Sequence, residues 1–119
     1  MIKLIKSFGY ALKGMLFVLK EQQNMRIHAL AILVVTIAGI FLGLTAIEWS
    51  VIALTISSVI VAEMMNTAIE DLVDLVSPEY NKPAGKIKDI AAGAVLLAAI
   101  VATVVGVYIF GNKIFNLLL

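Results

Sequence analysis

The 119-residue sequence contains no cysteine, only two prolines and few charged residues, which make up 14% of the chain. The lack of cysteine excludes disulfides and thiolate chemistry. The sequence also lacks a glycine-rich kinase loop and a GxxxxGK[ST] phosphate loop, so ATP would have to bind by a different architecture. The prolines predict helix boundaries, because Ser77-Pro78 ends one helix and Lys82-Pro83 delays the next.

Hydrophobic residues are abundant instead, at 62% of the chain, and the mean hydropathy is +1.07. This exceeds what a soluble core of one domain's length needs to bury, so the sequence predicts a membrane protein. The nine basic residues lie at the ends of apolar segments. They are placed there to meet lipid headgroups, and we expect no nucleic-acid partner.

Three apolar stretches are candidates for membrane-spanning helices, each of which needs about 20 residues. Residues 29–47 and 90–111 carry no charge, whereas the middle stretch has 14 uncharged residues before Glu63. Because 14 helical residues cover only about 21 Å, the middle helix needs part of the acidic segment that follows to complete its crossing. We therefore expect one all-α membrane domain over residues 1–119. Its spans are expected at about 27–47, 49–72 and 88–111.

Lysine and arginine are distributed unevenly around these spans. Eight of the nine lie before the first span or between the second and third, and only Lys113 follows the third. The positive-inside rule then predicts a cytoplasmic N-terminus and a C-terminus outside. In this topology the acidic end of the second span faces the cytoplasm.

Residues 1–23 predict a helix of another kind. Apolar side chains gather on one face, while Lys6, Lys13 and Lys20 recur every seven residues on the other. Such an amphipathic helix lies in the membrane interface and does not span the bilayer. It is either a plain membrane anchor or a cover for a site at the cytoplasmic surface.

Small residues recur at helical spacing on the first and third spans. Gly39 and Gly43 share a face of the first span, as do Ala91, Ala94 and Ala98 on the third. This spacing favours close helix packing and self-association.

The segment VAEMMNTAIEDLVDL, residues 61–75, places polar side chains in the second span. Glu63, Asn66, Glu70 and Asp74 fall on one face of a helix. A charged side chain near the middle of a span costs about 2.5–3.5 kcal/mol, so this stripe needs compensation. It is either the solvated end of a helix leaving the membrane or a carboxylate cluster that binds a divalent metal such as Mg²⁺.

Cations lie beside the same cytoplasmic end of the second span. Lys86 and Lys88, followed by Asp89, begin the next helix after a short loop. Phosphoryl transfer depends mainly on positioning and charge neutralisation. Acids for a metal and a lysine for phosphate therefore point to a phosphoryl-transfer site.

The stretch AEMMNTAIEDLVDL, followed by SPEYNKPAGKIKDIAAGAVLL, resembles the prokaryotic diacylglycerol kinase family. The family pattern is E-x-x-N-[ST]-[AS]-x-E-x-x-x-D, followed by a Lys-Asp pair that opens the last helix. The likeness continues through GYALKGM and NMRIH and covers nearly the whole chain. The resemblance implies a surface helix with three membrane helices, and a homotrimer whose active sites are shared between neighbouring subunits. It also implies ATP as co-substrate and Mg²⁺ as cofactor.

Matched motif positions imply roles for individual residues. Glu63 is expected to be the base that takes the proton from a lipid hydroxyl, with Asn66 orienting the cluster and Glu70 holding Mg²⁺ against the ATP phosphates. Seven further residues are expected to contact the nucleotide, two of them from the surface helix: Lys3, Tyr10, Glu79, Tyr80, Asn81, Lys88 and Asp89.

One position departs from the family pattern. The family usually has a glutamate, a second metal ligand, two residues before the asparagine of N-[FM]-R-I-H, and here that residue is Gln22. A neutral amide is a poorer Mg²⁺ ligand than a carboxylate. Either the adjacent Glu21 reaches the metal as its second ligand, or Glu70 and the phosphates hold the ion with more water.

Two lipids are candidate substrates, and one function of another class is a rival to the kinase. An acid at the interface requires a substrate with its hydroxyl there, which suits both a polyprenol and diacylglycerol. The segments NTAIE, NMRIH and KDIAAGAVLL look more like the undecaprenol kinase branch, so undecaprenol is favoured. The rival is a small oligomeric transporter with Glu63 as an ion site, which the lack of charge in the outer half disfavours. A purely structural subunit is the least attractive, given the cost of the acidic stripe.

Overall fold

The computed structural model describes all 119 residues, which form four helices. The expectation of an all-α protein is confirmed. Three of the helices are long and apolar enough to cross a membrane, so the chain is an integral membrane protein. The helices are α1 (Ile2–Glu21), α2 (Gln23–Leu42), α3 (Ala46–Val76) and α4 (Lys82–Leu118).

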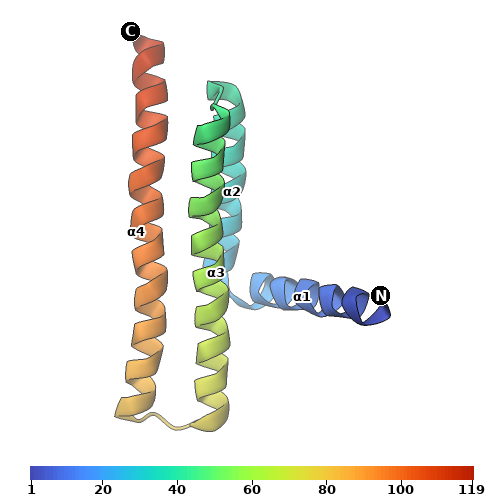
Figure 1. The fold of residues 1–119 in the computed structure, drawn as a ribbon. Coiled ribbons are helices and arrows are strands. Elements are labelled where there is room, and N and C mark those ends of the chain that lie inside the picture. The colour runs from blue at the N-terminus through green and yellow to red at the C-terminus, as the bar shows by residue number, and fades with distance from the viewer.

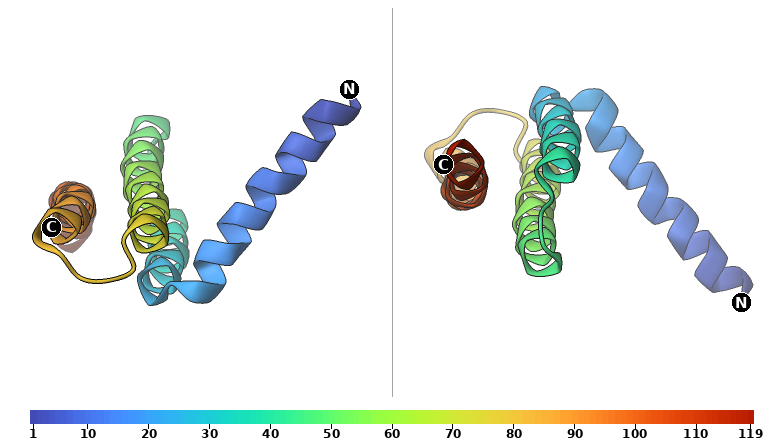
Figure 2. Two further views of the ribbon diagram at one scale, coloured as in Figure 1. Left: turned by 90° about the horizontal axis from the view of Figure 1, so that it is seen from below. Right: turned by 90° about the horizontal axis from the view of Figure 1, so that it is seen from above.

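The helices α2, α3 and α4 run side by side, whereas α1 runs crosswise to them (Figure 1). Seen along the bundle, α2 and α4 lie on different sides of α3, and α1 extends outward on the side away from α4 (Figure 2). With 31 and 37 residues, α3 and α4 are about 46 and 55 Å long. Both exceed the hydrocarbon core of about 30 Å, so each must project from the membrane.

A tight turn joins α2 to α3. Gly43 adopts the left-handed conformation with φ of 68°, which glycine reaches without steric cost. Thr45 then caps α3 by accepting from the Glu48 backbone N–H at 3.2 Å, while Glu48 Oε2 accepts from the Thr45 N–H at 2.8 Å. The apolar run expected to span as far as residue 47 is therefore divided, and α2 ends at Leu42.

A sharp elbow joins α1 to α2 at Gln22, whose backbone is extended. Arg26 crosses this elbow, and its Nη1 donates to the carbonyl oxygens of Lys20 at 2.6 Å and Leu19 at 3.4 Å. These carbonyls belong to the last turn of α1, where no helical N–H follows to satisfy them. The guanidinium therefore replaces the missing donors and holds α1 crosswise to the bundle.

Helices α3 and α4 pack against each other along faces whose buried positions recur every seven residues, and we call this contact the seam. The buried and half-buried positions that form this seam on α3 are Ile52, Ile56, Val59, Glu63, Asn66, Glu70 and Val73. On α4 they are Ala84, Lys88, Ala91, Val95, Ala98, Ala102, Val105 and Ile109. Residues spaced alternately four and three positions apart stay on one face of a helix, so they can contact a neighbouring helix over many turns. Three polar side chains of α3 thus occupy its packing face.

Ion pairs at both ends fix the register of this seam. At the α2–α3 end, Lys113 Nζ lies 3.0 Å from Glu48 Oε2 and donates to the Gly43 carbonyl at 3.2 Å. At the opposite end, Lys88 Nζ donates to Asp74 Oδ1. Both pairs match the antiparallel register of the two helices.

This register decides what the acids of α3 meet across the seam. It places Glu63 level with Ala98 and Glu70 level with Ala91. Alanine lets the helices approach closely and brings no charge. Glu63 is therefore level with a small apolar residue of α4, and it takes part in neither of the two ion pairs.

The small residues Gly39 and Gly43 both have roles within the chain. The indole of Trp49 rests on Gly39, where an added Cβ would lie 2.6 Å from Trp49 Cη2. Gly43 forms the turn described above. Of the alanines expected to favour self-association, Ala91 is buried within the chain, and Ala94 is exposed.

The contact between Gly39 and Trp49 makes a testable prediction. We expect Gly39→Ala to lower the free energy of unfolding by about 1–3 kcal/mol, because the ring must move out of a packed position. Thermal unfolding in detergent measures this, and Trp49→Leu in the same chain should restore part of the loss. Gly93→Ala is the matched control, since its Cβ meets no atom within 4 Å. Equal midpoints for Gly39→Ala and Gly93→Ala would contradict the packing described.

Candidate functional site

Three polar residues of α3 are buried next to one another. Glu63 is 2% exposed, Thr67 2% and Asn66 9%. The Thr67 hydroxyl donates to the Glu63 backbone carbonyl at 3.0 Å, so it is satisfied. Glu63 Oε2 and Asn66 Oδ1 are buried without any hydrogen-bond partner. Because buried polar oxygens are costly when unpaired, these two atoms point to a ligand from outside the chain.

Asn66 is hydrogen-bonded to the next acid along the helix. Its Nδ2 donates to Glu70 Oε1 at 3.3 Å, and Glu70 is half-buried. This bond fixes the amide group, whose oxygen has no partner in the chain. Glu63, Asn66 and Glu70 thus form a row of oxygen acceptors along one face of α3, as expected from their spacing.

The oxygen acceptors suit a hard divalent cation. Mg²⁺ binds one or two carboxylates and completes its shell with water and phosphate oxygens. The chain holds no group of three or more histidine, cysteine or acidic side chains placed to hold a metal by themselves. The row therefore fits an ion that arrives with phosphate, and Glu70 is the carboxylate that would hold it.

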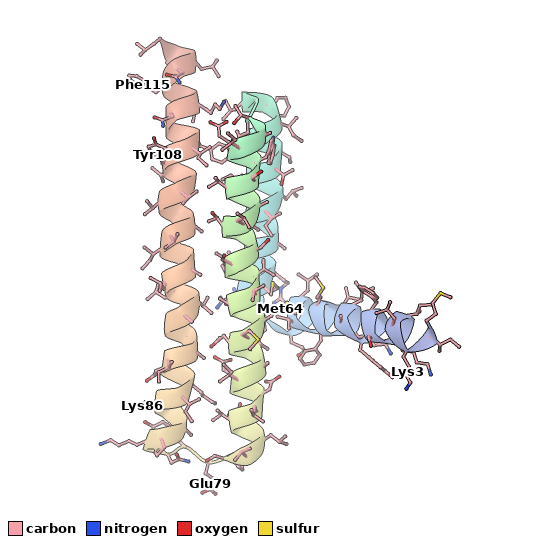
Figure 3. The ribbon with its side chains drawn as sticks, viewed as in Figure 1. Lys3, Met64, Glu79, Lys86, Tyr108 and Phe115 are labelled. Carbon is pink, nitrogen blue, oxygen red and sulfur yellow. The ribbon has the colours of Figure 1, made fainter.

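A second group of polar residues lies at the α3–α4 loop. It lines a cavity of about 310 Å³, at the end of the bundle marked by Glu79 and Lys86 in Figure 3. Four of the residues expected to contact nucleotide line this cavity, namely Glu79, Tyr80, Lys88 and Asp89. Asp74, Ser77 and Gly85 line it as well.

Two contacts shape this loop cavity. The ion pair between Lys88 and Asp74 crosses it, with side chains 37% and 60% exposed. The ring of Tyr80 lies over Gly85, where a Cβ would come within 3.1 Å of Tyr80 Cε2. Tyr80 itself is 87% exposed. A flat aromatic surface beside a lysine suits a ligand that has both a base and phosphates.

Asn81 has a structural role that its motif position did not indicate. Its Oδ1 accepts from the Ala84 backbone N–H at 2.9 Å and caps α4. Its Nδ2 donates to Ser77 Oγ and to the Glu79 carbonyl at 3.4 Å. Asn81 thus fixes the loop on which the cavity is built, and it is absent from the cavity lining.

Besides Asn81, three predicted site residues lie outside both groups. Lys3 is near the far end of α1, away from the loop with Glu79 and Lys86 (Figure 3). Tyr10 is 68% exposed on the same helix, with Lys13 Nζ 5.9 Å from its ring centre. Glu21 is the exposed last residue of α1. One chain alone does not bring Lys3 or Tyr10 to the loop cavity.

Sequence reasoning missed Ser77 and Gly85. The sequence places Thr67 on the polar face with Glu63 and Asn66, but gives it no role, and in the structure its hydroxyl bonds within its own helix. Ser77 and Gly85 lie in a loop and a first helical turn, where serine and glycine are common for local reasons. The spacing of Asp74 and Lys88, fourteen residues apart, also gave no sign of an ion pair.

Comparison with known proteins places this architecture in a family. The model of the prokaryotic diacylglycerol kinase family matches residues 9–110. Undecaprenol kinase of Bacillus subtilis is 37% identical over 112 residues, covering 94% of this chain and 91% of that protein. Diacylglycerol kinase of Synechocystis sp. is 46% identical over 104 residues, which cover 87% of this chain and 59% of that protein. Diacylglycerol kinase of Escherichia coli is 31% identical over 102 residues, covering 86% of this chain and 84% of that protein.

The chain therefore belongs to the prokaryotic diacylglycerol kinase family. The resemblance inferred from its motifs is confirmed, both for the family and for the presence of an undecaprenol kinase among the relatives. The matched region includes the buried Glu63, the half-buried Glu70 and the loop cavity.

The capping role of Asn81 makes a second testable prediction. Asn81→Ala should lower the free energy of unfolding by about 1 kcal/mol, because the first turn of α4 loses its side-chain acceptor. Hydrogen exchange of the amides at 84–86 should rise with it. Asn81→Ser keeps an acceptor at the cap, so its free energy of unfolding should stay near that of the unsubstituted chain. If serine and alanine have the same effect, capping is not the role of this side chain.

Proposed function

We propose that the chain transfers the γ-phosphoryl group of ATP to the hydroxyl of a membrane lipid alcohol, with undecaprenol favoured as the substrate. The reaction takes place at the cytoplasmic face of the membrane and requires Mg²⁺. The family membership, the relatives named for lipid kinases, and the two polar groups on α3 and its loop support this proposal.

The observation that supports this proposal most is the burial of Glu63 without a full set of hydrogen-bond partners. Its side chain is buried, and one carboxylate oxygen has no partner in the chain. A carboxylate in this position is a general base that waits for a hydroxyl proton to accept. The apolar seam around it suits a substrate whose remainder is lipid.

The loop cavity is the proposed nucleotide site. Tyr80 would stack on the base, while Lys88 would leave Asp74 to contact phosphate, since a lysine ammonium is a mobile point charge. Glu70 lies between this cavity and Glu63, where it would hold Mg²⁺ with the phosphates. When bound, Mg²⁺ would neutralise phosphate charge during transfer. Glu21 is proposed as a second ligand from the elbow.

The position of α1 suggests how the site meets the membrane. Met64 lies at the level where α1 joins the bundle (Figure 3), and α3 continues for twelve residues beyond it, which is about 18 Å. If α1 lies in the interface as its amphipathic pattern predicts, this projecting end and its cavity stand in water. Glu63 then lies at the membrane boundary, the N-terminus in the cytoplasm and the C-terminus outside.

A homotrimer accounts for the residues that one chain leaves apart. Lys3 lies at the far end of α1 (Figure 3), and neither Lys3 nor Tyr10 lines the loop cavity of its own chain. Tyr10 falls within the residues that match the family model, whereas Lys3 precedes them. In a cyclic trimer, each α1 would extend toward a neighbouring subunit. Each active site would then combine the α3 acids of one subunit with the surface helix of the next.

Two alternatives have less support. Diacylglycerol as the substrate would make phosphatidic acid with the same residues, and two of the relatives above are named for that lipid. A transporter with Glu63 as its ion site would need further polar groups toward the outer end, where Lys113 and Glu48 are paired with each other.

The base role of Glu63 makes a third prediction. Glu63→Gln should lower turnover of undecaprenol by at least about 10²-fold, since a positioned base contributes 10²–10⁴-fold, while MgATP binding stays within twofold. Turnover is measured with labelled ATP in detergent micelles, and binding by equilibrium dialysis.

Asp71→Asn is the matched control for this variant. Asp71 is an exposed acid of the same helix with no side-chain contact along the seam, so its amide should leave turnover near the unsubstituted level. Full activity of Glu63→Gln, or equal losses in both variants, would remove Glu63 from the role of base.

The shared site makes a fourth prediction. Lys3→Met and Glu63→Gln should each be inactive alone. If each site takes Lys3 and Glu63 from neighbouring subunits of a cyclic trimer, a mixture assembled at equal amounts should regain about a quarter of full activity, because mixed trimers have one intact site in three. Cross-linking reports the subunit number. No recovery in a trimer that exchanges subunits would show that each site lies within one chain.

A further inference from the structure

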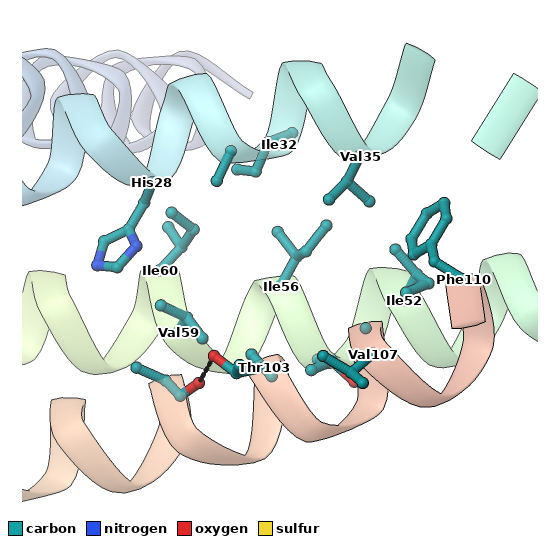
Figure 4. Close-up of a pocket in the computed structure, with 15 residues that line it drawn as sticks. His28, Ile32, Val35, Ile52, Ile56, Val59, Ile60, Thr103, Val107 and Phe110 are labelled. Carbon is teal, nitrogen blue, oxygen red and sulfur yellow. Dashed lines mark hydrogen bonds between the residues drawn. The ribbon is translucent and has the colours of Figure 1, made fainter. Parts of the chain in front are cut away.

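The cavities of the chain differ in the charge of their walls. The apolar cavity between α2, α3 and α4 has a volume of about 470 Å³, and no lysine, arginine or acid lines it (Figure 4). The loop cavity shares no residue with it. The lining of the loop cavity has one lysine, Lys88, and three acids, Asp74, Glu79 and Asp89. A phosphate that enters the loop cavity therefore meets a single cation among these acids.

No other basic residue of the chain lines the loop cavity. Lys82 and Lys86 belong to the same end of α4, but both are exposed and lie outside the lining. Lys88 is itself engaged, because its Nζ donates to Asp74 Oδ1 across the cavity. The other two acids of the lining form no ion pair. Asp74 thus holds the one cation of this cavity that a phosphate would contact.

A carboxylate and a phosphate are the same kind of partner for an ammonium group. Both present negatively charged oxygens that accept charge-assisted hydrogen bonds. If Lys88 kept Asp74 while it bound a phosphate, the two anions would lie against the same nitrogen and repel each other. A phosphate is therefore expected to displace Asp74, and the flexible four-carbon stem of a lysine allows this exchange.

The exposure of the ion pair sets the size of the effect. The side chains of Lys88 and Asp74 are 37% and 60% exposed, so water screens their attraction. Exposed ion pairs of this kind change an equilibrium constant by less than about fivefold. The contact is thus weak enough for a nucleotide to break and strong enough to lower the affinity for that nucleotide measurably.

We propose that Asp74 is an internal competitor of the nucleotide, which occupies Lys88 while the loop cavity is empty and lowers the affinity for phosphate. This inference rests on the proposed function and describes a regulation of the same site. The role assigned to Asp74 is not catalytic, because the carboxylate acts through Lys88. Recapture of Lys88 by Asp74 also favours release of the product ADP.

Removing the charge of Asp74 tests this competition. Asp74→Asn should lower the Kd for MgATP by about two- to fivefold, because Lys88 is then free for phosphate. The Kd for MgADP should fall by a similar factor. Both constants are measured by equilibrium dialysis of the protein in detergent micelles without lipid alcohol. Asp74→Glu keeps a carboxylate, so its Kd should stay within about 1.5-fold of that of the unsubstituted chain.

The sign of the change decides between two roles of the carboxylate. An unchanged Kd in Asp74→Asn would overturn the proposal. A higher Kd would overturn it as well, since the carboxylate would then hold Lys88 in place for the nucleotide.

A second background separates competition for Lys88 from simple repulsion between Asp74 and phosphate. Lys88→Met leaves no cation to compete for, so adding Asp74→Asn to it should change the Kd for MgATP by less than about 1.5-fold. The same decrease in both backgrounds would show that Asp74 acts by repulsion alone and would refute the competition.

Asp71→Asn is the matched control for the loss of a negative charge. Asp71 is an exposed acid one helical turn before Asp74, and it lies outside the lining of the loop cavity. Its Kd for MgATP should stay within about 1.5-fold of that of the unsubstituted chain, because water and salt screen an exposed charge. A decrease equal to that of Asp74→Asn would also refute the competition.

The same measurements distinguish failure of this inference from failure of the proposed function. If the unsubstituted chain binds no MgATP, the proposed function fails and the inference fails with it. If the chain binds MgATP and phosphorylates undecaprenol, yet Asp74→Asn leaves the Kd unchanged, only the inference fails.

Discussion

The antiparallel pairing of α3 with α4 is the constraint on which the rest of the structure depends. Both helices present a face with a seven-residue period, and ion pairs at the two ends hold the register. Because that register sets alanines of α4 level with acids of α3, the helices can approach closely without placing a cation beside Glu63. The catalytic proposal and the loop cavity both follow from this pairing.

The seam also explains why the polar residues differ in exposure. Glu63 lies inside the seam and is 2% exposed, whereas Asp74, three turns further, points away from the seam, is exposed and meets Lys88. Eleven residues of helix separate them, or about 16 Å. One helix thus places an apolar environment for a lipid at one position and a solvated environment for phosphates at the other.

Helix α1 adds a second constraint through its elbow. Arg26 completes the last turn of α1, which fixes the helix crosswise to the bundle and sends Lys3 away from the other polar residues. A helix held in this direction does not reach the loop cavity of its own chain. It could contact the site of a neighbouring subunit, and this is the physical basis of the trimer proposal.

The sequence by itself determined that this is a helical membrane protein with a polar face on its middle span. Apolar runs, lysine placement and the spacing of Glu63, Asn66 and Glu70 are local properties, and local periodicity decides which residues share a helix face. The motif likewise identified the family, which the comparisons confirm.

Only the tertiary structure decided what each face packs against. The indole of Trp49 on Gly39, the ion pair between Lys88 and Asp74 and the burial of Glu63 depend on contacts between different helices. The apolar cavity between α2, α3 and α4 is lined by residues of all three helices. Periodicity assigns residues to a face, but the register and partner of that face arise from packing, which no single segment contains.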